Sequence, residues 1–134
     1  KHSQFVSSRF EPNEFSRLFF EHNFFVTMHF TIALFVTVSA FYRIGCFNHK
    51  GNVIPTLVDL RKEVNLKDTQ PTIMKCAELA QEKGYKYFSV GLNGICFSGP
   101  KAGESYFTKG AAPNKKCAKG IGSKASSVVF TFGK

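Results

Sequence analysis

The sequence predicts a small α+β domain that is stapled by disulfide bonds and in which one helix packs on a short antiparallel sheet. Two observations support this prediction. The stretch from Pro71 to Gly99 contains a helix pattern followed by a hairpin pattern, and the chain has four cysteines, of which two lie in this stretch. Because all four cysteines and all 11 glycines lie after residue 40, we assign the domain to residues 41–134.

The helix is expected between Pro71 and Gly84. Proline suits the first turn of a helix, where its missing N–H is not needed. Small or apolar side chains recur at the spacing of one helix face, at Ile73, Cys76, Ala77 and Ala80. Gly84 can adopt the left-handed conformation that ends many helices. We therefore expect one helix face to be buried.

A hairpin is expected directly after the helix. Residues 85–90 are rich in aromatic side chains, which favour strands, and residues 95–97 are apolar. Asn93 and Gly94 stand between them and are a strong turn signal, because both positions of such a turn need a positive φ. The sequence therefore predicts two antiparallel strands in this part of the chain.

The first and last strands of the domain are expected at 41–47 and 127–132, lying side by side. The last strand alternates, so we expect Val128, Phe130 and Phe132 on one side of it. Residues 57–68 are predicted to form a loop or a short helix. Residues 100–126 are rich in Gly, Lys, Ser and Ala and are expected to form a long loop without a clear pattern.

Four cysteines allow three pairings, and their positions favour one of them. Cys76 lies on the buried face of the expected helix, and Cys96 lies in the hairpin beneath it. We therefore expect a Cys76–Cys96 bond and, by exclusion, a Cys46–Cys117 bond from the first strand to the long loop. The alternative is four free thiols in a cytosolic protein. A metal site is disfavoured because the spacings contain no C-x-x-C pair.

Residues 1–40 are expected to be a leader, with a candidate signal peptide at 28–40. An apolar run follows Met28 and ends in the small residues of a cleavage site, Val38-Ser39-Ala40. On this interpretation residues 1–27 are untranslated sequence or an extended leader, and the mature domain is secreted and extracellular. The alternatives are a membrane anchor, because the uncharged run has about the ~20 residues of a span, and a buried helix of the mature fold.

The positive charge of the chain is concentrated in the domain. Residues 1–40 have three basic and three acidic side chains, so the whole net charge of +9 comes from residues 41–134. A domain this basic favours anionic partners, such as sulfated glycans, acidic matrix, lipid headgroups or nucleic acid.

Enzyme and cofactor motifs are missing from the sequence. It contains no G-x-S-x-G, P-loop or H-E-x-x-H motif. His49, the one histidine after residue 40, is expected in a solvent-facing turn, and residues 120–124 are interpreted as a flexible loop rather than a phosphate-binding loop. The sequence therefore predicts no enzymatic activity, no cofactor and no metal.

One stretch is similar to an RNA-binding motif. Residues 83–90 approximate the RNP1 strand, whose aromatic side chains stack on bases. Lys86 stands where that motif has Gly or Ala, and Val90 where it has an aromatic residue. We interpret Tyr85, Tyr87 and Phe88 as packing residues, and we expect no nucleic-acid partner.

The long loop holds the candidate ligand-binding residues. Its lysines surround an aromatic pair, so they could neutralise a sulfated or carboxylated sugar whose ring stacks on Tyr106. The alternative is a solvated loop whose lysines serve solubility. The candidate residues are Lys101, Tyr106, Phe107, Lys109, Lys115, Lys116 and Lys119.

Four short motifs within residues 42–132 together carry a resemblance to a known family. They are Gly45-Cys46-Phe47, Thr72-x-x-x-Cys76, GYKYF at 84–88 and GICFSG at 94–99. This pattern resembles the WSC domain, more loosely the PAN/apple group of secreted cysteine-rich modules, and small secreted proteins of corals and sea anemones. WSC domains usually have two further cysteines, where this chain has Ala80 and Ser98. The loss of both corresponds to the removal of one bridged pair, which supports the Cys76–Cys96 pairing. The resemblance implies glycan binding.

The expected function is therefore that of a secreted, non-enzymatic module that binds anionic extracellular glycans or acidic matrix through a basic loop with aromatic residues. One alternative is a secreted effector or venom-type toxin that acts on membranes or channels, for which a membrane surface is the partner. Another is a structural protein of an extracellular or skeletal organic matrix.

Overall fold

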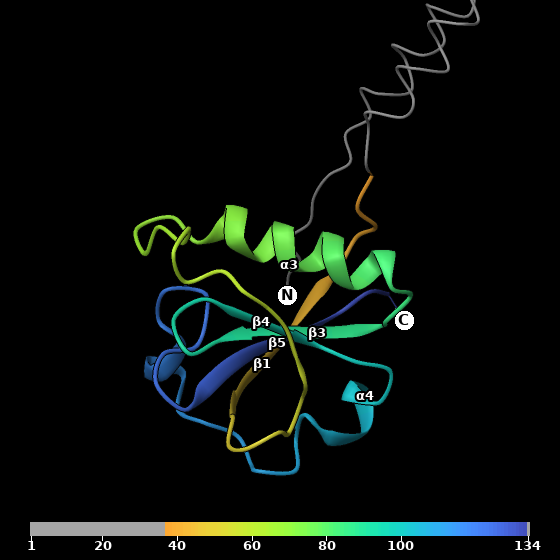
Figure 1. Cartoon of the computed structure of the whole chain (residues 1–134). Coiled ribbons are helices and arrows are strands. Elements are labelled where there is room, and N and C mark those ends of the chain that lie inside the picture. Colours follow the sequence, from red (N-terminus) through yellow and green to blue (C-terminus); the bar gives the residue numbers. More distant parts are fainter. Residues whose placement is uncertain (1–36, 134) are drawn as a thin grey trace, which may run out of the picture.

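The computed structural model describes residues 37–133 and shows an α+β domain built on one five-stranded sheet (Figure 1). This confirms the predicted fold class. The strands are β1 (Tyr42–Asn48), β2 (Thr56–Asp59), β3 (Tyr87–Gly91), β4 (Ile95–Ser98) and β5 (Ser126–Thr131). The helices are α3 (Gln70–Glu82), α4 (Ala102–Ser105) and the 3-10 helix η1 (Asn114–Cys117). Residues 1–27, and residues 28–36 of the candidate signal peptide, lie outside the described residues.

The sheet has the strand order β1-β5-β3-β4-β2, and every neighbouring pair is antiparallel. The first and last strands, β1 and β5, pair as predicted. The strands β3 and β4 form the predicted hairpin, with positive φ angles of 63° at Asn93 and 134° at Gly94. In the sheet, β5 therefore lies between β1 and β3, so the last strand joins the first strand to the hairpin.

The helix α3 covers one face of the sheet, and α4 lies on the opposite side (Figure 1). The face of α3 predicted to be buried is buried, and Gly84 has the left-handed φ of 79° expected after a helix. Beneath α3 the sheet contributes side chains that are at most 4% exposed: Phe88, Val90, Val128 and Phe130. The main core therefore lies between the helix and the sheet.

The second face of the sheet is covered as well, by α4 and by the segment between β1 and β2. A smaller core forms there from Val53, Ile54, Phe97 and Ala102. The prediction of a loop or short helix for residues 57–68 is wrong at its beginning, because residues 56–59 form the edge strand β2. Leu57 and Val58 are both half-buried, so this four-residue strand lacks the alternation that indicates a strand in a sequence.

The chain is packed into the domain from just before β1. Phe41 is 1% exposed, and its ring makes edge-to-face contacts with Phe88 and Phe130 at centroid distances of 5.3 and 5.5 Å. The amide of Gln81 accepts a hydrogen bond from the backbone N–H of Ser39 and donates one to the carbonyl of Thr37, both at 2.7 Å. Residues 37–41 are thus tied to the sheet and to the end of α3.

Both predicted disulfide bonds are formed. Cys46 and Cys117 are bonded with their Cα atoms 6.1 Å apart, and Cys76 and Cys96 are bonded with their Cα atoms 5.4 Å apart. All four cysteines are buried. One bond fastens α3 to β4, and the other fastens η1 to β1.

Within residues 37–133, none of the helices has the length and apolar character needed to cross a membrane.

Candidate anion-binding site

The structure divides the seven candidate binding residues into two groups. Lys101, Tyr106, Phe107 and Lys109 lie on or near α4, which packs against β3 on the second face of the sheet. Lys115, Lys116 and Lys119 lie on or directly after η1, whose Cys117 belongs to the core under α3. The sequence prediction had treated these seven residues as one surface.

In the first group, Tyr106 is a packing residue. Its ring stacks on Tyr87 at a centroid distance of 5.6 Å and meets the edges of Phe47 and Phe107, each at 5.0 Å. Phe107, in contrast, is 51% exposed. The ring available to a ligand near α4 is therefore that of Phe107, whereas Tyr106 supports it from behind.

The strand that is similar to an RNP1 motif also uses its aromatic side chains for packing. Phe88 is fully buried under α3, and Tyr87 stacks on Tyr106. The ring of Phe88 is therefore closed to a base, and Tyr106 covers one face of Tyr87. This arrangement agrees with the interpretation of these residues as packing residues.

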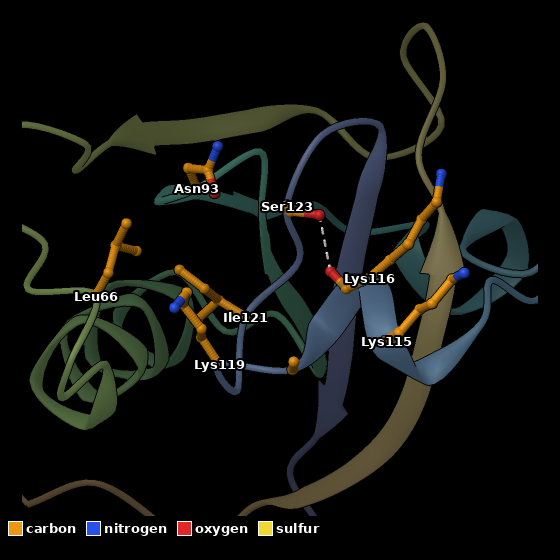
Figure 2. Close-up of a pocket in the computed structure, with 8 residues that line it drawn as sticks. Leu66, Asn93, Lys115, Lys116, Lys119, Ile121 and Ser123 are labelled. Carbon is orange, nitrogen blue, oxygen red and sulfur yellow. Dashed lines mark hydrogen bonds between the residues drawn. The ribbon is translucent and has the colours of Figure 1, made fainter.

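The second group surrounds a hollow of about 80 Å³ that we call the lysine-rimmed hollow. In Figure 2 the side chains of Lys115 and Lys116 extend away from Leu66, whereas Lys119 lies between Leu66 and Lys116. All three lysines are exposed. The residues that line the hollow are Leu66, Asn93, Lys115, Lys116, Ala118, Lys119, Ile121 and Ser123.

Four hydrogen bonds and a disulfide hold the walls of this hollow in place. The carbonyl of Lys116 accepts bonds from the N–H and the hydroxyl of Ser123, at 2.9 and 3.0 Å. The Thr69 hydroxyl donates to the carbonyl of Lys119 at 2.6 Å, and the Asn93 N–H donates to the carbonyl of Gly122 at 2.9 Å. Cys117 is bonded to Cys46. The backbone of the lysine-rimmed hollow is therefore held in place before any ligand binds.

The same contacts correct the expectation of a flexible loop at residues 120–124. Ile121 is 2% exposed and belongs to the main core. Gly122 donates its N–H to the carbonyl of Val90 at 3.0 Å. This segment is fixed against β3 and against the hairpin turn, which its glycine-rich composition did not indicate.

The charged side chains that line the hollow are all positive. The sequence has no Asp or Glu after Glu104, and none of the described residues that line the hollow is acidic. Within residues 37–133, no ion pair involves Lys115, Lys116 or Lys119. Their positive charges are therefore available to an anion.

Asp59, on the edge strand β2, does not neutralise this surface. Its carboxylate pairs with Arg61 at 2.6 Å. Hydrogen bonds from Arg61 lower the pKa of Asp59 to about 2. Asp59 therefore stays ionised and bound to its own neighbour at physiological pH.

His49 is a residue whose environment the sequence prediction missed. The prediction of a solvent-facing turn is wrong: His49 is 5% exposed, and its ring lies on that of Phe97 at a centroid distance of 3.9 Å. Its backbone N–H donates to the carbonyl of Ala125 at 2.9 Å, while its Nδ1 has no hydrogen-bond partner among the described residues. The apolar pair Val53-Ile54 just downstream was the available signal that this segment crosses a buried face.

The burial of His49 predicts that acid destabilises the domain. Desolvation lowers the pKa of His49 below its ordinary value of 6.5, so the unfolded chain binds the proton more readily than the folded one. The free energy of unfolding should therefore be highest above about pH 6.5 and should fall as the pH drops through the folded-state pKa. Urea unfolding of wild type and His49→Phe at pH 7 and pH 5 measures this. The loss should be smaller in His49→Phe, which keeps an aromatic ring on Phe97; equal losses would contradict the prediction.

Comparisons with known proteins assign no family to the chain. No protein-family model matches it, and no curated protein matches it in sequence.

Among residues 37–133, no group of three or more His, Cys, Asp or Glu side chains is placed to hold a metal ion. What the geometry offers chemically is a rigid hollow lined by three lysines, with no His, Cys, Asp or Glu among the described residues that line it.

Proposed function

We propose that this protein is a secreted, non-enzymatic module that binds anionic extracellular polymers, either sulfated or carboxylated glycans or acidic matrix, through Lys115, Lys116 and Lys119. One observation carries the proposal: three exposed lysines line one hollow whose walls are fixed by hydrogen bonds and whose described lining contains no carboxylate. Clustered charges of one sign raise the local concentration of a polyanion and speed its association.

Two further observations support an extracellular location. Buried disulfides persist in oxidising compartments and are rare in the cytosol. The candidate signal peptide at 28–40 supplies a route of export. The resemblance to the WSC domain adds glycan binding as the expected activity of such a module.

The α4 group provides a second candidate contact for a long polymer. Lys101 and Lys109 are exposed, and the ring of Phe107 is the largest exposed apolar surface near them. A polymer held by the lysines of η1 could place a sugar ring on Phe107, because stacking on an aromatic ring needs only a free face. In this arrangement η1 supplies most of the electrostatic attraction.

Heparin chromatography tests the proposal. Wild type should be retained and should elute at a salt concentration well above that of Lys115→Gln/Lys116→Gln/Lys119→Gln. At an anionic surface each lysine is worth on the order of 1 kcal/mol, so removing three should weaken binding by about 100-fold.

The matched control is Lys50→Gln/Lys75→Gln/Lys83→Gln, which removes the same charge from exposed positions elsewhere on the domain. It should elute close to wild type. If both triple variants elute early by the same amount, retention depends only on net charge, and the η1 site is not the binding site.

A further inference from the structure

The lysine-rimmed hollow has a cationic rim but an apolar wall. Leu66, Ala118 and Ile121 are the apolar residues of its lining. Figure 2 shows the ammonium groups of Lys115 and Lys116 directed away from Leu66 and Ile121. An anion alone would contact the rim and leave this wall unused.

The volume of the hollow limits what can enter it. Its volume is about 80 Å³, and it is open to solvent on one side. Pockets for small-molecule ligands span about 300–1,000 Å³. The hollow is therefore too small for a sugar ring or a cofactor, but it can take the few methyl groups of one aliphatic side chain.

Its concave shape favours a polypeptide over a membrane. An amphipathic helix binds a bilayer by burying a protruding apolar face at the boundary between headgroups and acyl chains. A concave apolar hollow surrounded by charged groups is instead typical of a protein interface, where an anchor side chain fills a pocket inside a polar rim.

We infer that the hollow receives one leucine-sized side chain from an acidic segment of a partner polypeptide, while carboxylates beside that side chain pair with Lys115, Lys116 and Lys119. This inference rests on the proposed function and narrows its partner to an acidic matrix protein. The positive charges of the three lysines favour an acidic segment, and the apolar wall favours an aliphatic side chain as the group that enters the hollow. Because hydrogen bonds and the Cys46–Cys117 bond already hold the walls, little ordering is needed on binding.

The experiment compares two fluorescent peptides on the oxidised protein. Each has eight glutamates around a central residue, which is leucine in one and alanine in the other, and binding is followed by fluorescence anisotropy at fixed salt. Burying the additional methylene and methyl groups should make the leucine peptide bind at least about tenfold more tightly. Ala118→Leu, which fills the hollow from its exposed wall, should remove that difference. Ala111→Leu, at an exposed position outside the lining of the hollow, should preserve it.

Each outcome separates this inference from the proposed function. Equal affinity for both peptides, with heparin retention intact, would overturn the inference and leave the proposed function standing. Failure of both peptides and of heparin to bind would overturn both. Binding to phosphatidylserine vesicles that Ala118→Leu abolishes, without a preference between the peptides, would overturn the inference in favour of a membrane partner. Thermal unfolding of Ala118→Leu establishes that the variant is folded.

Discussion

Replacing Cys46 and Cys117 together by alanine should lower the free energy of unfolding by about 4 kcal/mol. The bond closes a loop with a sequence separation of 71 residues, and chain-entropy arguments assign about 4 kcal/mol to a loop of that length. The Cys76–Cys96 bond spans only 20 residues and should contribute about 3 kcal/mol. All four cysteines are buried to a similar degree, so replacing either pair by alanine should remove a similar amount of packing. The difference in stability between the two double-alanine variants should therefore come from the difference in loop length.

Urea unfolding of the oxidised variants, with the two double-alanine proteins compared directly, measures this difference. The Cys46→Ala/Cys117→Ala variant should also be retained less strongly on heparin, because η1 then loses its covalent bond to β1. The Cys76→Ala/Cys96→Ala variant should keep it while folded. If the two variants have the same unfolding midpoint and the same retention, the Cys46–Cys117 bond has no special role at the site.

Replacing Phe41 by alanine should cost about 3–5 kcal/mol, the usual range for a buried phenylalanine. Its side chain is 1% exposed, and it packs edge to face on Phe88, Phe130 and Phe132, the last at a centroid distance of 6.2 Å. Cleavage after Ala40, as expected from the sequence, would leave this core residue at the N-terminus and would remove the hydrogen bonds of Thr37 and Ser39 to Gln81. The first residue of the domain would then be one of its most important packing residues.

The neighbouring residue is the control for this prediction. Tyr42 is 45% exposed, so Tyr42→Ala should change the free energy of unfolding by less than about 1 kcal/mol. Chemical denaturation of both variants at pH 7 measures the two values. A loss in Phe41→Ala no greater than that in Tyr42→Ala would show that the aromatic cluster does not depend on Phe41.

The features that the sequence predicted correctly are those with local signals. The spacing of Ile73, Cys76 and Ala80 indicates a buried helix face on its own, and Asn93-Gly94 indicates a hairpin on its own. The disulfide pairing followed from these two, because a cysteine on a buried helix face needs a partner in the sheet below. The predicted pairing of the first strand, β1, with the last strand, β5, is also present in the sheet.

The features that could not be predicted from the sequence depend on contacts between segments that are far apart in the chain. His49 is buried only because the segment after β1 crosses the second face of the sheet and reaches Phe97. Tyr106 lies close to Lys115 in the chain, yet its ring packs on Tyr87 while Lys115 lines the hollow beside η1.

The hollow itself could not be predicted from the sequence for the same reason. Leu66 and Asn93 join Lys119 there from two segments of the chain that are far apart. No local pattern in a sequence reports such a meeting, because it depends on how α3, the hairpin and η1 are placed on the sheet.

The most direct test of the central claim is a nuclear magnetic resonance titration of the ¹⁵N-labelled oxidised protein with a heparin-derived oligosaccharide. We predict saturable shifts that are largest at the amides of Lys115, Lys116 and Lys119 and of the adjoining Asn93 and Ser123, with smaller changes near Phe107. Largest shifts at residues 101–109, or no saturable shift at any residue, would contradict the assignment of anion binding to the lysines of η1.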